Sequence, residues 1–187
     1  MMLRWAIATA GALALALLTL NVPMPWALAS REPSPAEEAA GGGAVCDAKA
    51  KPANLNFTLK DAANKDLTIG AYKGKVIVLD FWATWCGPCK YEIPGFVDLQ
   101  QRYGPRGLQV IGVSVDDTRE KLPPFAREYH INYPILQGLG HDDMQEAYGP
   151  IFGIPTSIVI SRDGKICRKH PGYTKKDVFE REIKALL

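Results

Sequence analysis

The sequence has little net charge and few histidines. Its 187 residues include 22 Lys and Arg and 20 Asp and Glu, which gives a formal net charge of +2. So small an excess provides no electrostatic attraction for a nucleic acid, and we expect no nucleic-acid partner. No internal repeat is visible, and the length suits one domain with a real hydrophobic core. The three histidines show no metal-ligand spacing to one another; they are His130, His141 and His170.

Cysteine is also scarce, with only four residues in the chain. Cys86 and Cys89 form one C-x-x-C pair, whereas Cys46 and Cys167 stand alone and far away in the sequence. A zinc site needs four ligands and usually two such pairs, so we expect no metal. A purely structural disulfide within the pair is also disfavoured, because Trp85 is not needed to close one. The pair is therefore interpreted as a redox dithiol.

The position of the dithiol supports this interpretation. An apolar run over residues 76–85 leads into Cys86-Gly87-Pro88-Cys89, where a helix is expected to begin. Cys86 would lie at the helix N-terminus, where free N–H groups and the helix dipole favour a thiolate. Cys89 would lie one turn inside, better covered, and would attack a mixed disulfide from the protein side. We thus expect Cys86 to be the more exposed sulfur and the nucleophile, and Cys89 the resolving thiol.

The N-terminal region differs in composition from the rest of the chain. Residues 5–30 contain no charged side chain, follow a short positive segment and end near the A-x-A sequence at 27–29. This pattern predicts a signal peptide or an N-terminal membrane anchor over residues 1–29, and an exported protein in either case. Residues 30–45 are rich in Pro, Ala, Glu and Gly and predict a flexible linker. We expect the folded domain at residues 46–187.

Strand and helix patterns alternate along the domain. Two continuous apolar runs, at 76–81 and 108–115, are typical of strands buried on both faces. The alternation, followed by a hairpin and a last helix, predicts a three-layer α/β domain. We expect strands at 55–59, 76–81, 108–115, 133–136, 156–161 and 166–169, and helices at 86–103, 119–129, 142–148 and 175–187, with a connector at 67–74.

Two segments resemble the thioredoxin family. Residues 80–90 read DFWATWCGPCK, and residues 148–156 match the segment that carries the cis-proline of that fold. Glu92 and Pro94, three and five residues after the second cysteine, look like the extracytoplasmic TlpA/ResA branch. The resemblance covers about residues 54–187 and implies a thioredoxin fold, a central mixed β-sheet flanked by helices. It also implies a TlpA/ResA-type insertion between the second buried strand and the cis-proline segment, within 116–148.

The same resemblance implies an activity and a location. The chain looks like a periplasmic (extracytoplasmic) thiol-disulfide oxidoreductase that reduces client proteins and needs no cofactor. Gly87 and Pro88 are the thioredoxin dipeptide, which sets the turn geometry and suggests a reductant. Family partners include a membrane thiol reductase as electron donor, and family clients include apocytochrome c and copper-site proteins of cytochrome oxidase. The alternatives are an oxidant of the same fold, a copper-handling thiol metallochaperone and a peroxiredoxin-like peroxidase.

Three acidic residues are candidates for tuning the dithiol. Asp80 lies within an apolar run and matches the buried aspartate of thioredoxin, so it either serves Cys89 as a general acid/base with a raised pKa or faces solvent. Glu92 either tunes the dithiol or touches a partner, or it is a solvated helix residue. Asp117 sits where some relatives carry an active-site acid, but we favour a role as a helix cap in Asp116-Asp117-Thr118.

The remaining candidates concern the substrate and the second cysteine pair. By resemblance, Ile154-Pro155 should be a cis peptide facing the dithiol, with the Ile154 backbone available to an extended substrate. Trp85 is expected to be a partly exposed wall of that surface, and Trp82 to be packing. An even cysteine count in an exported protein favours pairing of Cys46 with Cys167, as a structural staple or, alternatively, a second redox dithiol.

Overall fold

The computed structural model describes residues 45–187. The predicted signal peptide or anchor at 1–29 lies outside the described residues, as does nearly all of the predicted linker at 30–45. Within the described part of the chain, every helix is too short or too polar to cross a membrane.

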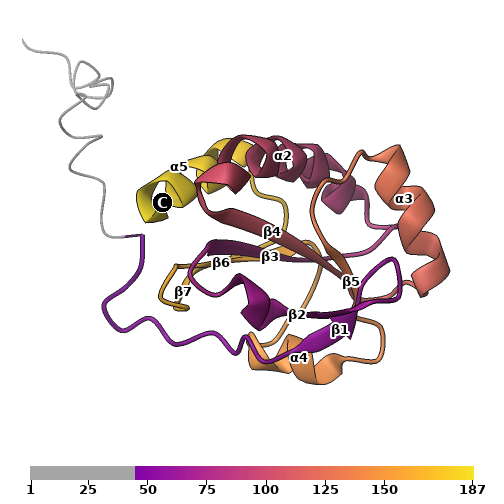
Figure 1. The fold of residues 1–187 in the computed structure, drawn as a ribbon, viewed down its shortest axis with the longest axis horizontal. Helices are drawn as coiled ribbons and strands as arrows, with labels where there is room; N and C mark the ends of the chain where they lie inside the picture. The colour runs from indigo at the N-terminus through magenta and orange to yellow at the C-terminus, as the bar shows by residue number, and fades with distance from the viewer. Residues whose placement is uncertain (1–44) are drawn as a thin grey trace, which may run out of the picture. The chain divides into compact units, whose positions relative to one another are not determined.

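A five-stranded mixed sheet forms the centre of the domain (Figure 1). Strands β3, β4 and β5 are parallel and make one half of the sheet. Strand β6 pairs antiparallel with the other edge of β3, and β7 pairs antiparallel with β6. Every residue of β3 and β4 is buried, which confirms the prediction from their apolar runs. The strands in spatial order are β5 (Ile135–Gln137), β4 (Leu108–Ser114), β3 (Val76–Trp82), β6 (Thr156–Ile160) and β7 (Ile166–Pro171).

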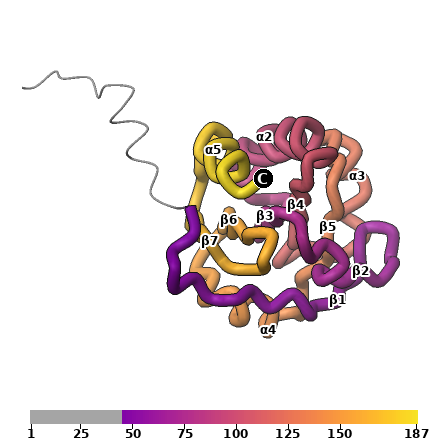
Figure 2. The backbone as a smooth tube through the Cα atoms, turned by 60° about the vertical axis from the view of Figure 1, so that its left-hand side comes forward, coloured from indigo at the N-terminus to yellow at the C-terminus, as the bar shows by residue number. Residues whose placement is uncertain are grey.

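Helices and a small hairpin cover the two faces of the sheet (Figures 1 and 2). Helices α2 (Gly87–Tyr103) and α5 (Lys176–Leu186) pack on one face, with α3 (Leu122–Glu128) at the β5 side. Helix α4 (Asp142–Ala147) and the hairpin of β1 (Thr58–Lys60) and β2 (Asp66–Thr68) cover the other face. The fold is thus the predicted thioredoxin fold, and the predicted insertion region contains α3, β5 and α4.

Side chains alternate between the two faces along β3. Ile77, Leu79 and Phe81 pack in the core beneath α4 and the hairpin. Val76 and Val78 pack with α2 and α5 in the other core. Because residues two apart on a strand share a face, Asp80 belongs to the face covered by α2. The strand thus directs its carboxylate toward the helix that carries the dithiol.

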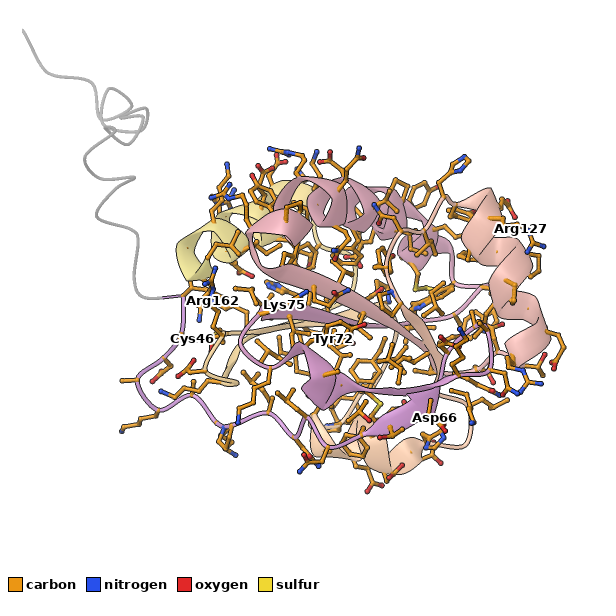
Figure 3. All side chains as sticks on the ribbon, viewed as in Figure 1. Cys46, Asp66, Tyr72, Lys75, Arg127 and Arg162 are labelled. Atoms are coloured by element: carbon orange, nitrogen blue, oxygen red, sulfur yellow. A yellow bond between two sulfur atoms is a disulfide. The ribbon has the colours of Figure 1, made fainter. Side chains whose placement is uncertain are left out.

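Short 3-10 segments complete the structure, at Ile69–Tyr72, Gly104–Arg106 and Arg119–Lys121. Charged side chains such as Asp66, Arg127 and Arg162 lie at the surface (Figure 3).

Some local predictions were wrong. The expected edge strand at 55–59 is shifted to β1, which pairs with β2 rather than with the central sheet. β2 itself lies in the region expected to be a connector, since Asp66–Thr68 is too short to show alternation.

Candidate active site

The dithiol lies at the start of α2, as predicted. Cys86 is the N-cap residue, Pro88 is in the first turn, and Cys86 is disulfide-bonded to Cys89. The backbone N–H of Cys89 donates a hydrogen bond to the Cys86 sulfur, with N and Sγ 3.2 Å apart. A sulfur that accepts a helix N-terminal N–H is in a position that stabilises negative charge. The local structure therefore favours Cys86 as the thiolate of the reduced protein.

Both sulfurs are well covered in this oxidised state. Cys86 is the more exposed of the two, but the difference is small, at 3% against 1%. Trp82, Ile93 and Phe125 belong to the cluster of buried side chains that contains both cysteines. A partner can therefore contact only the small part of Cys86 that is left exposed.

Asp80 is buried on the α2 side of β3, so the alternative of a solvent-facing carboxylate is wrong. The Ser157 hydroxyl, on neighbouring β6, donates a hydrogen bond to Oδ1 of Asp80 at 3.0 Å. Burial raises the pKa of Asp80 well above its usual range, nearby Glu92 raises it further, and the Ser157 bond lowers it. The raised pKa lets this carboxyl hold a proton at a higher pH than an exposed aspartate would, which suits a general acid/base.

Glu92 is buried as well, so its interpretation as a solvated helix residue is wrong. The side chain is 4% exposed, and its Oε1 accepts a hydrogen bond from the backbone N–H of Thr174. Its Oε2 is buried with no hydrogen-bond partner in the described part of the chain. Burial raises the pKa of Glu92 to about 7, while the Thr174 N–H and His170 lower it. A carboxyl with a pKa of about 7 therefore interacts with the buried Asp80.

The two buried acids affect each other and a third group. Glu92 raises the pKa of Asp80, and both acids raise the pKa of Tyr133, after the larger effect of its own burial. The negative charge of an ionised Glu92 disfavours ionisation of Asp80, so the two acids do not both ionise easily. Such a pair can store a proton close to the dithiol helix.

Asp117 does not cap a helix, because the N-cap residue of the next 3-10 segment is Thr118 and no side chain caps that segment. Its buried carboxylate instead accepts hydrogen bonds from the Thr84 N–H at 2.7 Å, the Thr84 hydroxyl at 2.6 Å and the Ser114 hydroxyl at 2.7 Å. Lys121 adds an ion pair at 3.8 Å. These bonds keep the pKa of Asp117 low despite its burial. Asp117 thus fixes the turn between β3 and the dithiol.

The predicted substrate-side residues include Trp85 on the dithiol side and Ile154 and Pro155 on the loop before β6. Trp85 is 59% exposed and Trp82 is buried, as expected. Ile154 packs against the cluster that contains both cysteines, and the Ile154–Pro155 peptide bond is cis. The Pro155 carbonyl accepts a hydrogen bond from the Gly172 N–H at 2.7 Å, which ties this loop to the end of β7. An exposed aromatic residue therefore directly precedes Cys86, and an apolar residue of the cis-proline loop packs on the cysteine cluster.

Reasoning from the sequence missed several polar residues of the site. Ser157 and Asp80 are register partners on adjacent strands, a pairing that no local pattern reveals. Thr84 and Ser114 contact Asp117, and Thr174 contacts Glu92 from 82 residues further along the chain. The only sequence signal was that Ser114 and Ser157 are hydroxyl residues inside apolar strands.

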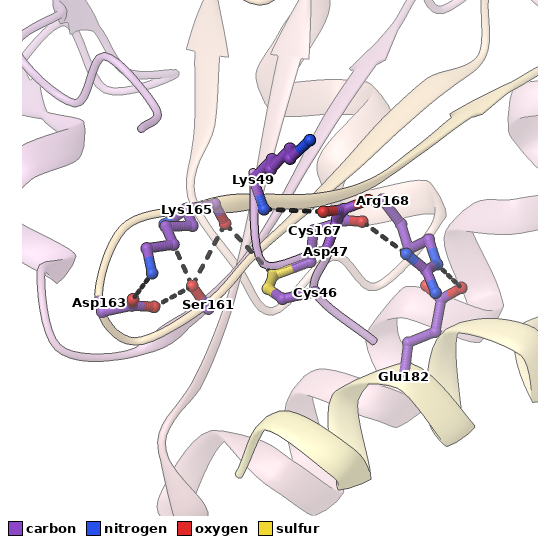
Figure 4. The surroundings of a disulfide bond; sticks show 9 residues. All are labelled: Cys46, Asp47, Lys49, Ser161, Asp163, Lys165, Cys167, Arg168 and Glu182. Carbon is purple, nitrogen blue, oxygen red and sulfur yellow. Dashed lines mark hydrogen bonds and ion pairs between the residues drawn. A yellow bond between two sulfur atoms is a disulfide. The ribbon is translucent and has the colours of Figure 1, made fainter. Parts of the chain in front are cut away.

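The second cysteine pair is also joined. Cys46 and Cys167 form a disulfide between the segment that precedes β1 and strand β7 (Figure 4). Backbone bonds from Ile166 N–H to Lys51 and from Ala53 N–H to Gly164 hold the same segment beside this hairpin. The pairing thus fastens the N-terminal arm of the domain to the edge of the sheet.

Within residues 45–187, no group of three or more His, Cys, Asp or Glu side chains is arranged to hold a metal ion.

Comparisons with known proteins agree with this geometry. A model described as the AhpC/TSA family matches residues 50–169. The thiol-disulfide oxidoreductase ResA of Bacillus thuringiensis subsp. konkukian is 30% identical over 131 residues, which cover 70% of this chain and 75% of the relative. ResA of Bacillus subtilis is 29% identical over 113 residues, covering 60% and 62% of the two chains.

Solved structures show the same likeness. The crystal structure of a thiol:disulfide interchange protein of the thioredoxin family from Chlorobium tepidum TLS superimposes with a TM-score of 0.68 at 30% identity. The match covers 75% of this chain and 99% of that chain. StoA from Bacillus subtilis shares the fold, with a TM-score of 0.57 at 24% identity over 70% of this chain and 98% of its own.

Proposed function

Because this chain belongs to the AhpC/TSA family and is a thiol-disulfide oxidoreductase, we propose that it reduces disulfides in exported client proteins. One arrangement carries the proposal. The Cys86 sulfur is the N-cap of α2, and Asp80 lies buried behind the dithiol helix. The helix N-terminus supports a thiolate that can attack, and the buried carboxyl can take the proton that the second thiol must lose.

The proposed reaction has two exchange steps. The Cys86 thiolate attacks one sulfur of the client disulfide, a mixed disulfide forms, and the other client sulfur leaves as a thiolate. Cys89 then loses its proton to Asp80 and attacks the Cys86 sulfur. The Cys86–Cys89 disulfide forms and the second client sulfur leaves, so two electrons pass from the dithiol to the client. Glu92 tunes this chemistry through the effect of its charge on the pKa of Asp80. Asp117 tunes it by holding the turn that positions Cys86.

The substrate surface of the proposal consists of Trp85, Gly87, Pro88, Ile154 and Pro155. Trp85 is exposed next to the nucleophile, and Ile154 packs on the cysteine cluster from the opposite loop. An extended client segment would lie between them, with its backbone beside that of Ile154.

The proposed setting is the periplasm or an equivalent extracytoplasmic space. The oxidised dithiol would be reduced again by a membrane thiol reductase, because that compartment does not supply reducing thiols. By resemblance, apocytochrome c and copper-site proteins of cytochrome oxidase are the proposed client classes. Residues 1–29 would direct export and then be cleaved or remain as an anchor.

The peroxidase alternative is not supported. Such an enzyme needs a threonine hydroxyl aimed at its nucleophilic cysteine, whereas the hydroxyl of Thr84 donates to Asp117.

Copper handling has a simple test, since a metallochaperone would retain copper through gel filtration when reduced.

A trapping experiment tests the proposed function. The Cys89→Ser variant, with Cys86 free, should accumulate mixed disulfides with clients in an exporting cell, because the resolving thiol is gone. The Cys86→Ser variant is the matched control and should trap few. If Cys86→Ser traps clients and Cys89→Ser does not, the assigned roles are reversed. If neither traps anything, the protein has no disulfide clients under those conditions and the proposal is wrong.

A further inference from the structure

Lys169 makes an unusual set of contacts on the loop that precedes Pro155. Its ammonium donates hydrogen bonds to three successive carbonyl oxygens: those of Tyr148 at 3.3 Å, Gly149 at 3.0 Å and Pro150 at 3.1 Å. These carbonyls lie where α4 ends, a place where a cation is favoured by the helix dipole and by unpaired carbonyls. Lys169 therefore joins strand β7 to the beginning of the loop.

Gly149, the second of these three residues, has a backbone conformation that favours glycine. Gly149 has a φ of +80°, a conformation that glycine adopts readily. A Cβ at this position would lie 3.4 Å from Nζ of Lys169. The positive φ of residue 149, which favours glycine, is therefore part of the turn that directs the three carbonyls toward one nitrogen.

The far end of the same loop is held independently. The Thr156 hydroxyl donates to the Gly153 carbonyl at 2.7 Å, and the Gly172 N–H donates to the Pro155 carbonyl at 2.7 Å. Between the two fixed ends, Phe152 is 95% exposed. Lys169 also lines the groove of about 530 Å³ that runs beside this loop, with Phe152, Ile154 and Pro171 among its other walls. The position of Lys169 therefore affects both the loop and the groove.

We propose that Lys169 is a positioning residue that holds the 149–154 loop in the shape that receives the client segment next to its disulfide. The inference rests on the proposed function, because it assigns that loop to client binding. Lys169 contacts neither sulfur, so it acts on how well an extended client binds rather than on the sulfur exchange itself.

Two substrates separate these effects. One is a short peptide whose cysteine is disulfide-bonded to a quencher thiol, and the other is oxidised glutathione, which offers little chain for the loop to hold. Lys169→Met keeps an unbranched side chain, one heavy atom shorter, and removes every donor. Lys165→Met is the matched control, since Lys165 is an exposed lysine on the same hairpin that pairs with Asp163.

We expect Lys169→Met to raise KM for the peptide by about tenfold with little change in kcat, consistent with losing charge-assisted hydrogen bonds that order the loop. The rate with oxidised glutathione should fall much less, and Lys165→Met should match the wild type with both substrates. Backbone amides at 151–154 should exchange hydrogen faster in Lys169→Met, while the global unfolding midpoint stays within the range of the control.

Two results would overturn the inference, and they can be told apart. If the wild-type protein reduces the peptide and Lys169→Met has an unchanged KM, the positioning role is wrong and the proposed function stands. If the reduced wild-type protein fails to reduce the peptide at all, the proposed reductase activity is wrong, and the role of Lys169 in it falls as well.

Discussion

At the scale of single residues, the site depends on two carboxylates that the fold withdraws from water. Asp80 lies on a central strand and Glu92 on the dithiol helix, and each has one hydrogen-bond donor, Ser157 or the Thr174 N–H. One donor does not offset the loss of hydration, so both pKa values rise. Perturbed acids of this kind are typical of sites that move protons.

Replacing Asp80 by Asn should slow the resolving step. The amide has the same shape but cannot take the proton of Cys89, so we expect the rate of mixed-disulfide resolution to fall by about tenfold to a hundredfold. The step can be followed by stopped-flow release of a chromogenic thiol bound to Cys86. Asp98→Asn, at a half-buried acid of α2 that pairs with Arg102 and Lys176, should leave the rate unchanged. An unaltered rate in Asp80→Asn would show that water, not Asp80, accepts the proton.

Glu92 should make the folded protein less stable as pH rises. Its pKa in the folded state is about 7, above the ordinary 4.5 of an exposed glutamate. Between these values the folded chain holds a proton that the unfolded chain has released, so the free energy of unfolding falls with increasing pH. Asp80, Tyr133 and His170 are the titratable groups that interact with Glu92 or its neighbouring acid.

We therefore expect Glu92→Gln to flatten the decline in stability from about pH 4.5 to pH 7 and to be more stable than the wild type at pH 8. Urea unfolding of the oxidised protein at several pH values measures this directly. Glu128→Gln, on the surface of α3, serves as the control. A wild-type curve that rises over the same interval would mean that Glu92 is ionised at little cost.

The sequence was informative for Asp80 but not for Glu92 or Asp117. Asp80 stands inside an apolar run, so its burial could be anticipated from its neighbours alone. The burial of Glu92 depends on Thr174, and that of Asp117 on Thr84, contacts that join distant parts of the chain. Short-range patterns contain no information about such tertiary partners.

At the scale of elements, Asp117 fixes the turn from β3 into α2, although it lies in the loop that follows β4. Asp117 follows β4, and β4 pairs in parallel with β3, so their C-terminal ends lie side by side. This brings the Asp117 carboxylate to the backbone N–H and the hydroxyl of Thr84, two residues before the nucleophile. The sheet topology thus positions Cys86 through one carboxylate.

Asp117→Asn should loosen this turn. Three groups donate to the Asp117 carboxylate: the Thr84 N–H, the Thr84 hydroxyl and the Ser114 hydroxyl. An asparagine NH₂ cannot accept a hydrogen bond, so at least one of these donors loses its partner, at a cost of about 1–3 kcal/mol. We also expect slower attack by Cys86 on oxidised glutathione. Urea unfolding and the rate of that reaction measure the two effects. Asp116→Asn is the matched control, because the neighbouring aspartate is exposed. Equal behaviour of the two variants would contradict the assigned role.

Elements with strong local signals were predicted well and short ones were not. The central strands and the dithiol helix have continuous apolar runs or a sharp start at a cap. β1 and β2 have three residues each, and their position depends on pairing with each other rather than on pattern. The contacts of Lys169 were not anticipated, because an alternating strand predicts an exposed lysine but not the carbonyls it meets.

At the scale of the whole domain, the Cys46–Cys167 disulfide closes a loop of 121 residues in sequence separation. In the chain-entropy model, a loop this long stabilises the folded state by about 4–5 kcal/mol, chiefly by restricting the unfolded chain. The bond also fastens the arm that precedes β1 to β7. We interpret it as a structural staple.

The double variant Cys46→Ser, Cys167→Ser tests that interpretation. We expect a loss of stability of up to about 4–5 kcal/mol in urea unfolding. The rate at which the Cys86–Cys89 dithiol reduces oxidised glutathione at low temperature should remain close to that of the wild type. A large loss of activity with little loss of stability would instead indicate that the second pair passes electrons to the first.

The proposed function requires that the domain donate electrons through Cys86 and Cys89. The most direct test is the reduction potential of this pair, measured on the purified protein in glutathione or dithiothreitol buffers, with the Cys46–Cys167 pair monitored separately. We predict a value near that of thioredoxin, about −270 mV, which makes the protein a reductant that needs an electron donor. A value above about −150 mV would make it an oxidant and would contradict the proposed direction of electron flow.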